Sequence, residues 1–202
     1  MKRKFNSNHE KYFTQNPISR LLVSNFFNEV EKLTSEIEFR SVLDVGCGEG
    51  HLINYLSKER PNTNYYAIDL DENEINAAKM NCPFGEFFVG TIHRLPFESN
   101  FVDLVINTEV LEHVEDPGVA IDELYRVTSH YALISVPREP LWRILNIMRL
   151  HYWNDLGNTP GHLNHWNSRS FAGFLAGRFK ILKISKPIPW TLILCEKKPV
   201  QE

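Results

Sequence analysis

The chain of 202 residues is long enough to bury one sizeable core, and its 43% hydrophobic and 23% charged residues are typical of a soluble globular protein. Its formal charge of −3 gives no electrostatic reason to expect a nucleic-acid partner. The three scattered cysteines fit neither a disulfide framework nor a zinc pattern, and no apolar run approaches the roughly 20 residues of a membrane span. We therefore expect a single domain in the cytoplasm, with its oligomeric state left open.

The chain begins with one predicted amphipathic helix over Ile18–Leu33, after which short apolar runs alternate with helical ones. The predicted strands are Ser41–Gly46, Tyr65–Leu70, Glu86–Thr91, Val102–Asn107 and Tyr131–Pro137. The predicted helices between them are His51–Glu59, Glu72–Asn81 and Pro117–Val127. Strands that are apolar on both faces and separated by helices predict a parallel sheet covered on both sides, which is a doubly wound, Rossmann-like α/β fold.

The last part of the chain follows a different pattern. Ser168 is predicted to cap a helix that runs to Gly177. Two further strands, Phe179–Ser185 and Thr191–Lys197, are separated only by KPIPW, which is too short for a crossover helix. We therefore expect these two strands to pair antiparallel.

The sequence VLDVGCGEG places Gly46, Gly48 and Gly50 directly after the first predicted strand. A loop that leaves a strand and opens a helix exposes unpaired N–H groups, although a plain tight turn would also explain the glycines. Asp69 ends the next strand, where dinucleotide folds bind ribose hydroxyls with an acid. The loop carries acids and lacks the Lys-Ser/Thr of a phosphate-binding loop, so a ligand with a cationic or zwitterionic end suits it better than a triphosphate.

Together, VLDVGCGEG, AIDLDENEI and VGTIHRLPFESNFVDLVINTEVLEHVEDP resemble the class I S-adenosylmethionine-dependent methyltransferases. The branch with the ubiquinone- and menaquinone-pathway enzymes is the most similar. The resemblance spans Ser41–Pro137 and implies a seven-stranded sheet closed by an antiparallel strand. It implies an enzyme that transfers a methyl group from S-adenosylmethionine to a small-molecule acceptor, lipid-linked acceptors included, by O- or N-methylation.

The resemblance also implies which residues contact the cofactor. The methionine end would lie over the glycine loop near Asp44, the ribose diol on Asp69, and the adenine against Leu70. Thr91 stands where the family commonly has an Asp for the adenine amino group, and this departure leaves the role of Thr91 in doubt. Leu70 and Ile92 would be buried in almost any α/β fold. The implied cofactor-binding residues are Asp44, Gly46, Cys47, Gly48, Asp69, Leu70, Thr91, Ile92, Asn107 and Thr108.

The sequence EVLEH places Glu109, Glu112 and His113 at i, i+3 and i+4 of a short predicted helix, and hence on one face. This pattern is similar to the metal site of some quinone-pathway O-methyltransferases and small-RNA 2′-O-methyltransferases. Relatives without a metal share LEHV, however, with a histidine that lines the pocket. We therefore assign no metal ligands and favour His113 as a catalytic base or hydrogen-bond donor that faces the substrate. Whether Glu109, Glu112 and His113 bind a divalent metal is left open.

An insertion rich in Trp, Arg and His, residues 138–167, interrupts the alternation and is a natural lid. It would cover the acceptor or lie on a membrane surface, although ordinary packing explains its apolar face equally well. No cysteine or acidic cluster completes a zinc site around GHLNHW, so its two histidines are predicted to line the pocket. In this branch an N-terminal segment with a tyrosine folds over the cofactor. The candidate substrate-binding residues are Tyr12, Trp142, His162 and His165.

Three other functions fit parts of the sequence. A nucleotide-dependent oxidoreductase shares the glycine loop, but the chain lacks a Tyr-x-x-x-Lys pair and the length for a substrate domain. A metal-assisted RNA methyltransferase should show a basic face, which the net charge of −3 does not favour, although the pattern of Glu109, Glu112 and His113 agrees with it. A non-catalytic cofactor-binding module fits Thr91 but not the aromatic insertion. We divide the single domain into N-terminal cap helices (1–40), a cofactor-binding core (41–137), a lid or substrate insertion (138–167), and a last helix with a hairpin (168–202).

Overall fold

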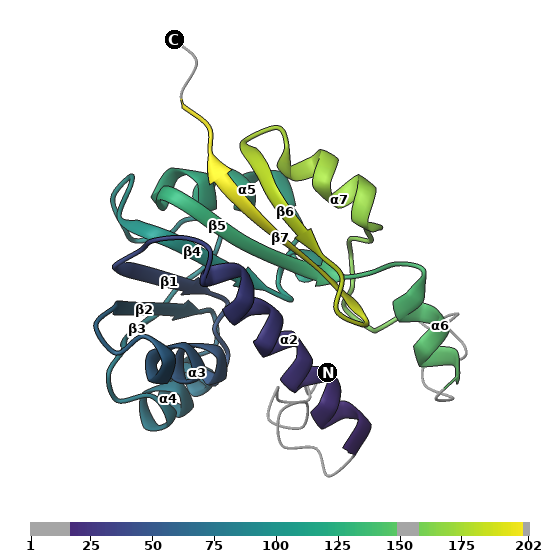
Figure 1. Ribbon diagram of the computed structural model, residues 1–202, viewed down its shortest axis with the longest axis horizontal. Coiled ribbons are helices and arrows are strands. Elements are labelled where there is room, and N and C mark those ends of the chain that lie inside the picture. Colours follow the sequence, from purple (N-terminus) through teal and green to yellow (C-terminus); the bar gives the residue numbers. More distant parts are fainter. Residues whose placement is uncertain (1–16, 149–157, 200–202) are drawn as a thin grey trace.

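The computed structural model describes residues 17–148 and 158–199, and Tyr12 lies outside them. Seven strands form one sheet in the order β3-β2-β1-β4-β5-β7-β6 (Figure 1). Strands β1 to β5 run parallel, whereas β7 is antiparallel to both β5 and β6. The Rossmann-like fold and the antiparallel C-terminal pair predicted from the sequence are confirmed. The strands are β1 (Ser41–Val45), β2 (Asn64–Asp69), β3 (Glu86–Val89), β4 (Val102–Thr108), β5 (Thr128–Pro137), β6 (Phe179–Ser185) and β7 (Trp190–Lys197).

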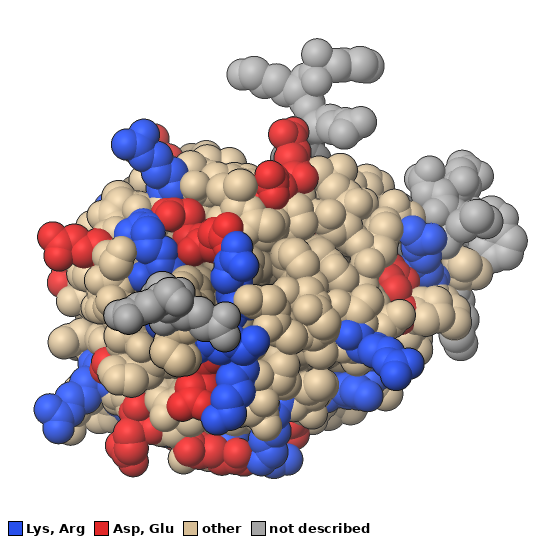
Figure 2. Space-filling view, turned by 90° about the horizontal axis from the view of Figure 1, so that it is seen from above, with Lys and Arg blue, Asp and Glu red and all other residues tan. Residues whose placement is uncertain are grey.

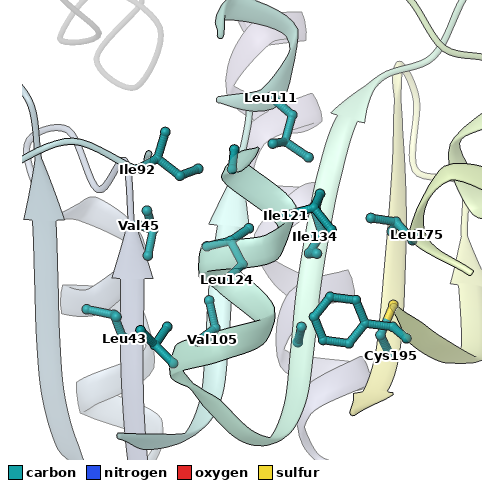
Figure 3. Close-up of a cluster of buried hydrophobic side chains, with 14 of the residues drawn as sticks. Leu43, Val45, Ile92, Val105, Leu111, Ile121, Leu124, Ile134, Leu175 and Cys195 are labelled. Carbon is teal, nitrogen blue, oxygen red and sulfur yellow. The ribbon is translucent and has the colours of Figure 1, made fainter. Parts of the chain in front are cut away.

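Helices cover both faces of the sheet, because successive strand residues point to opposite sides. Val42 and Leu104 pack with α2 and α3 on one face, whereas Leu43 and Val105 pack with α5 and α7 on the other. Figure 3 shows the α5 side, where Ile121 and Leu124 of the helix lie over β1, β4 and β5. The helices are α2 (Pro17–Thr34), α3 (His51–Glu59), α4 (Glu72–Asn81), α5 (Pro117–Val127), α6 (Leu141–Met148) and α7 (Ser168–Leu175), with a short 3₁₀ helix η1 (Leu111–His113).

The cap of α7 differs from the predicted one. Asn167 is the N-cap residue, and its side chain accepts hydrogen bonds from the backbone N–H groups of Arg169 and Ser170. The hydroxyl of Ser168 lies 2.9 Å from that of Thr191 at the start of β7 instead. The prediction that Ser168 caps this helix is therefore wrong, since a contact with the sheet draws its side chain away from the helix axis.

The order of the strands reverses between β1 and β4, which are neighbours in the sheet but far apart in the chain. From β1 the chain moves outward to β2 and β3, and from β4 it moves outward to β5. In open α/β sheets ligands bind at the carboxyl ends of the strands beside such a reversal. The fold therefore directs attention to the loops that follow Val45 and Thr108.

Two surface properties bear on possible partners. No helix in the described ranges is long and apolar enough to cross a bilayer. On the face that Figure 2 shows, Lys and Arg side chains lie among Asp and Glu side chains, without a large field of one sign. That face lacks the uniform basic stripe that typifies a nucleic-acid surface.

We expect Leu124→Ala to lower the free energy of unfolding by about 2–5 kcal/mol, because Leu124 is fully buried between α5 and the sheet. Val119→Ala in the same helix is the matched control, since Val119 is 43% exposed and its truncation should change stability by less than about 0.5 kcal/mol. Urea unfolding followed by circular dichroism measures both. Equal losses in the two variants would contradict this packing of α5.

Candidate active site

The loop after β1 is held in one shape by its glycines. Gly46, Gly48 and Gly50 all have positive φ angles, of 80°, 52° and 74°. A Cβ atom on Gly46 would lie 2.2 Å from a methyl group of Val110, so only glycine fits between the two chain segments. The amides of Gly46 and Cys47 donate to the carbonyl oxygen of Ile68, at 2.7 and 3.2 Å. The loop is thus bonded to β2 on one side and packed against the segment after β4 on the other.

Asp69, at the end of β2, accepts hydrogen bonds on both carboxylate oxygens. The amide of Gly48 donates to Oδ2 at 2.8 Å, and the amide of Asp71 donates to Oδ1 at 3.0 Å. A carboxylate has about four acceptor positions, so Asp69 retains capacity for further donors such as a diol. The predicted pair of glycine loop and acid is therefore brought into direct contact.

Asp44 is 1% exposed, and its Oδ1 has no hydrogen-bond partner in the described part of the chain. Burial, and then the charge of Asp69, raise the pKa of the Asp44 carboxyl to about 7. Asn107, at the end of the neighbouring strand, donates to the carbonyl of Val45 at 2.7 Å, and its buried Oδ1 likewise has no partner among the described residues. Two buried oxygens that lack donors mark a place for a ligand with an ammonium group.

Burial of Cys47, and then the charges of Asp44 and Asp69, raise the pKa of its thiol. Cys47 therefore stays protonated and contributes packing.

The adjacent strand ends carry the residues predicted to face an adenine. Asp69 pairs with Val89 across the sheet, so Leu70 and Thr91 follow neighbouring strand ends. Ile92 is 8% exposed and belongs to the core, as expected. The expectation that Leu70 is buried is wrong, since Leu70 is 75% exposed and lies just beyond the end of β2.

The loop after β4 departs from the predicted helix. Glu109 has a φ of 60°, and its amide donates to the carbonyl of Ser135 on β5 at 3.3 Å. Only Leu111–His113 form a helical turn, of the 3₁₀ type. The prediction that Glu109, Glu112 and His113 share one helix face is therefore wrong. A bond to β5 turns the backbone at Glu109 before the helix begins, and the Glu109 carboxylate accepts from the Ser135 hydroxyl at 3.3 Å.

His162 of the insertion takes the place that Glu109 was expected to fill. One ligand atom each of Glu112, His113 and His162 lies within 4.8 Å of the others, so these three side chains could hold a divalent cation. The rings of His113 and His162 meet edge to face at 4.8 Å, and His162 stacks on Trp142 at 5.9 Å. The structure thus brings together three of the predicted catalytic and substrate-binding residues, namely His113 of η1 and Trp142 and His162 of the insertion.

Asn164 joins these two parts, although the sequence analysis did not identify it. Its side-chain amide donates to the carbonyls of Leu111 and Val114, at 3.1 and 2.7 Å. The backbone amides of Leu163 and Asn164 both donate to the carbonyl of Glu112. The position of Asn164 between two histidines in GHLNHW was the one available sign, and nothing in the sequence says which loop it binds.

Glu139 is a second residue that the sequence analysis missed. Both of its carboxylate oxygens are buried without a hydrogen bond to any described residue, while Arg143 Nε and His165 Nδ1 each lie 3.6 Å from Oε1. Burial and then Arg143 lower the pKa of His165, against the opposing effect of Glu139. His165 therefore lies in a charged cluster beside His162 rather than in the same ring stack, with 6.5 Å between the ring centres.

Comparison with known proteins supports the class predicted for this site. Residues 43–135 match a family described as a methyltransferase domain, and they include the glycine loop, Asp69 and the β4 loop. The match agrees with the resemblance to the class I S-adenosylmethionine-dependent methyltransferases over the cofactor-binding core. It is consistent with S-adenosylmethionine as the cofactor of this chain.

Individual relatives are distant. Over 111 residues the chain is 35% identical to an uncharacterized 37.1 kDa protein in transposon TN4556 of Streptomyces fradiae, covering 53% of this chain and 32% of that protein. It is 29% identical to a probable S-adenosylmethionine-dependent methyltransferase of Mycobacterium tuberculosis, covering 52% and 38%. The chain thus spans about a third of the length of these curated relatives.

Among solved structures, the chain is similar to the magnesium protoporphyrin IX methyltransferase of Synechocystis with bound S-adenosylhomocysteine. The TM-score is 0.71 at 16% identity, with 94% of this chain and 92% of that chain covered. At this identity the likeness establishes the fold alone. The residues of this chain nevertheless fit the cofactor on their own chemistry, because Asp44 and Asn107 offer buried oxygens to an ammonium group and Asp69 offers acceptor positions to a diol.

The burial of Asp44 predicts that this residue lowers the stability of the free protein at neutral pH and strengthens cofactor binding. Because its folded pKa of about 7 lies above the ordinary 3.8, the ligand-free protein should lose stability as the pH rises from about 4 to about 7. Asp44→Asn removes this loss and should stabilise the free protein at pH 8, by up to roughly 4 kcal/mol, while it weakens cofactor binding.

Thermal unfolding at pH 5 and pH 8 checks this expectation. The exposed Glu98→Gln serves as control, because its removal should change the melting temperature little at either pH. A gain in stability for Asp44→Asn that is no larger at pH 8 than at pH 5 would show that Asp44 is not a strained, ionisable group.

Proposed function

We propose that this chain transfers the methyl group of S-adenosylmethionine to a small-molecule acceptor. The observation that carries the proposal is the buried Asp44 oxygen beside a glycine loop, at the reversal point of the sheet. A buried carboxylate without a donor is costly, and an ammonium group is the partner that best offsets this cost. The wider proposal, that the acceptor is lipid-linked and methylated on O or N, rests on the insertion beside this site.

In the proposed complex, Gly46, Cys47 and Gly48 bind the amino-acid end of the cofactor, and Asp44 orients its ammonium group. Asp69 accepts the ribose hydroxyls, with Leu70, Thr91 and Ile92 around the adenine and Asn107 and Thr108 beneath the methionine portion. When bound, the cofactor supplies an electrophilic methyl group on a sulfonium. The protein then has to align an acceptor with it and remove a proton from that acceptor.

His113 is the residue that we propose for this proton. Its Nδ1 lies 3.1 Å from the carbonyl oxygen of Gly161, and since that oxygen can only accept, Nδ1 carries the hydrogen. In the neutral imidazole Nε2 then carries the lone pair and can take the acceptor proton. The His113 side chain is 37% exposed, so it is open to an acceptor. His162, His165 and Trp142 would line the acceptor side, and Tyr12 lies outside the described residues.

A second candidate is transfer assisted by a divalent cation on Glu112, His113 and His162. The proximity of their ligand atoms, within 4.8 Å, favours it. In this case Nε2 of His113 would ligate the ion, and the ion would lower the pKa of an acceptor hydroxyl. The two candidates make opposite predictions about chelators.

We expect calorimetric titration to show saturable binding of S-adenosylmethionine and no binding of NAD. Asp69→Asn should weaken cofactor binding by about ten- to a hundredfold, because a charged acceptor for the Gly48 amide and the diol is lost. Glu72→Gln is the matched control, since Glu72 is an exposed acid in the adjoining first turn of α4. Binding of NAD in place of the methyl donor would overturn the proposal.

We expect His113→Asn to lower kcat by roughly a hundredfold or more on an acceptor found by screening for release of S-adenosylhomocysteine, with cofactor affinity unchanged. His130→Asn, an exposed histidine on β5, should be neutral. If His113 acts as a base, EDTA leaves the wild-type rate unchanged. A rate that EDTA abolishes and Mg²⁺ or Mn²⁺ restores would instead support the cation on Glu112, His113 and His162.

A further inference from the structure

Three chain segments meet beside the candidate active site, at the carboxyl edge of the parallel strands. They are the first part of α2 (residues 17–28), helix α6, and the turn between β6 and β7 (residues 185–191), which lie on the same lower side of the molecule in Figure 1. Trp190 connects them, because its ring lies 4.9 Å from Phe26 of α2 and 6.4 Å from Trp142 of α6. The amide of Arg138 also donates to Pro189 at 2.9 Å.

Each of these segments presents aliphatic side chains to solvent. On α2, Ile18 is 60% and Leu21 is 70% exposed, and they share a helix face at i and i+3. Ile144 of α6 is 48% exposed, and Ile188 in the turn is 50% exposed. We call these four residues the aliphatic rim. The aromatic side chains of the segments pack inward instead, so the rim residues are not what holds the segments together.

The charges of the same segments are of one sign. Each contains one cation, namely Arg20, Arg143 or Lys186, and none contains an aspartate or glutamate, although the whole chain has a net charge of −3. Arg143 faces the buried Glu139, which lies just outside α6. Arg20 and Lys186 form no ion pair with any described residue. A second acid, Glu29, follows the α2 part directly and accepts a hydrogen bond from the Ser185 hydroxyl at 2.6 Å. Exposed aliphatic groups with cations among them that form no ion pair are the features of a surface that lies on an anionic bilayer.

We propose that the aliphatic rim and its cations dock on the surface of an anionic lipid bilayer, so that the acceptor reaches the site from the membrane. This inference rests on the proposed function and names the origin of its substrate. The contact is peripheral, and no helix in the described ranges spans a bilayer. Trp142 is not the anchor, because its indole nitrogen donates to Thr159 at 2.8 Å and its ring stacks on His162.

Docking here would bring the reaction to its substrate. The β6–β7 turn lies at the carboxyl end of β5, because Trp190 pairs with Pro137 across the two strands. Ligands of open α/β sheets enter at this edge. A lipid-linked acceptor held at the rim would therefore need only to extend its head group past α6 to reach His162 and His113.

The test is co-sedimentation of the full chain with vesicles of phosphatidylcholine, and of an equimolar mixture with phosphatidylglycerol. We expect binding to the mixed vesicles alone, weakened by salt. Ile188→Glu and Leu21→Glu should each reduce the partition coefficient about tenfold or more, and so should Lys186→Glu, which reverses a charge. Phe84→Glu is the matched control, since Phe84 is 82% exposed and precedes β3, at the opposite edge of the sheet.

Two results would overturn the proposal: no binding to either vesicle, or binding that the rim variants leave unchanged. A third result would assign the rim to a second copy of the chain. In that case the wild type binds no vesicles and is a dimer in light scattering, and Ile188→Glu makes it a monomer. Titration of each variant with S-adenosylhomocysteine keeps the two proposals apart. Normal cofactor binding without vesicle binding rejects the docking surface alone, whereas absent cofactor binding by folded wild type rejects the proposed function.

Discussion

The hydrogen bond from the Gly48 amide to the Asp69 carboxylate is the contact on which the candidate site depends. It ties the loop after β1 to the end of β2 and gives the loop a fixed negative neighbour. On its other side the loop is packed by Val110, which leaves no room for a side chain on Gly46. The carbonyl of Val110 in turn accepts from the amide of His113 at 2.9 Å. The residues proposed for the cofactor and for the proton are thus positioned by one continuous set of contacts, each of which includes a backbone group.

Hydrogen bonds also attach the insertion to η1. Asn164 satisfies two carbonyls around η1, and the carbonyl of Glu112 accepts from two amides of the same loop. Because these donors and acceptors are backbone groups or a fixed amide, the loop and η1 form one unit. His162 is therefore held against His113 by the backbone, independently of any ligand. A preorganised wall of this kind spares the protein the entropic cost of ordering it when an acceptor binds.

The core of the fold could be predicted because its signals are local. Apolar runs of strand length, separated by helical ones, gave the bounds of α3, α4, α5 and β6 to the residue. Predictions failed where a distant contact decides the local structure. Asn167 and Ser168 are both residue types that cap helices well. Only the contact of the Ser168 hydroxyl with Thr191 of the sheet decides that Asn167 is the cap. The bond from Glu109 to Ser135 and the approach of His162 to His113 join segments far apart in the chain, which residue spacing cannot reveal.

The antiparallel pairing of β7 has an evolutionary consequence. A parallel strand has to be reached by a crossover, so a change in that connection disturbs a helix and the sheet face beneath it. The β6–β7 hairpin needs no crossover, because its two strands pair antiparallel. The buried residues of β7 hold the register, so exposed residues of the turn such as Ile188 can change without moving the strands. Descendants of this chain can therefore acquire new surroundings by altering the hairpin turn while the machinery after β1, β2 and β4 is inherited unchanged. Exchange of that turn alone is accordingly the simplest route for redirecting the protein by engineering.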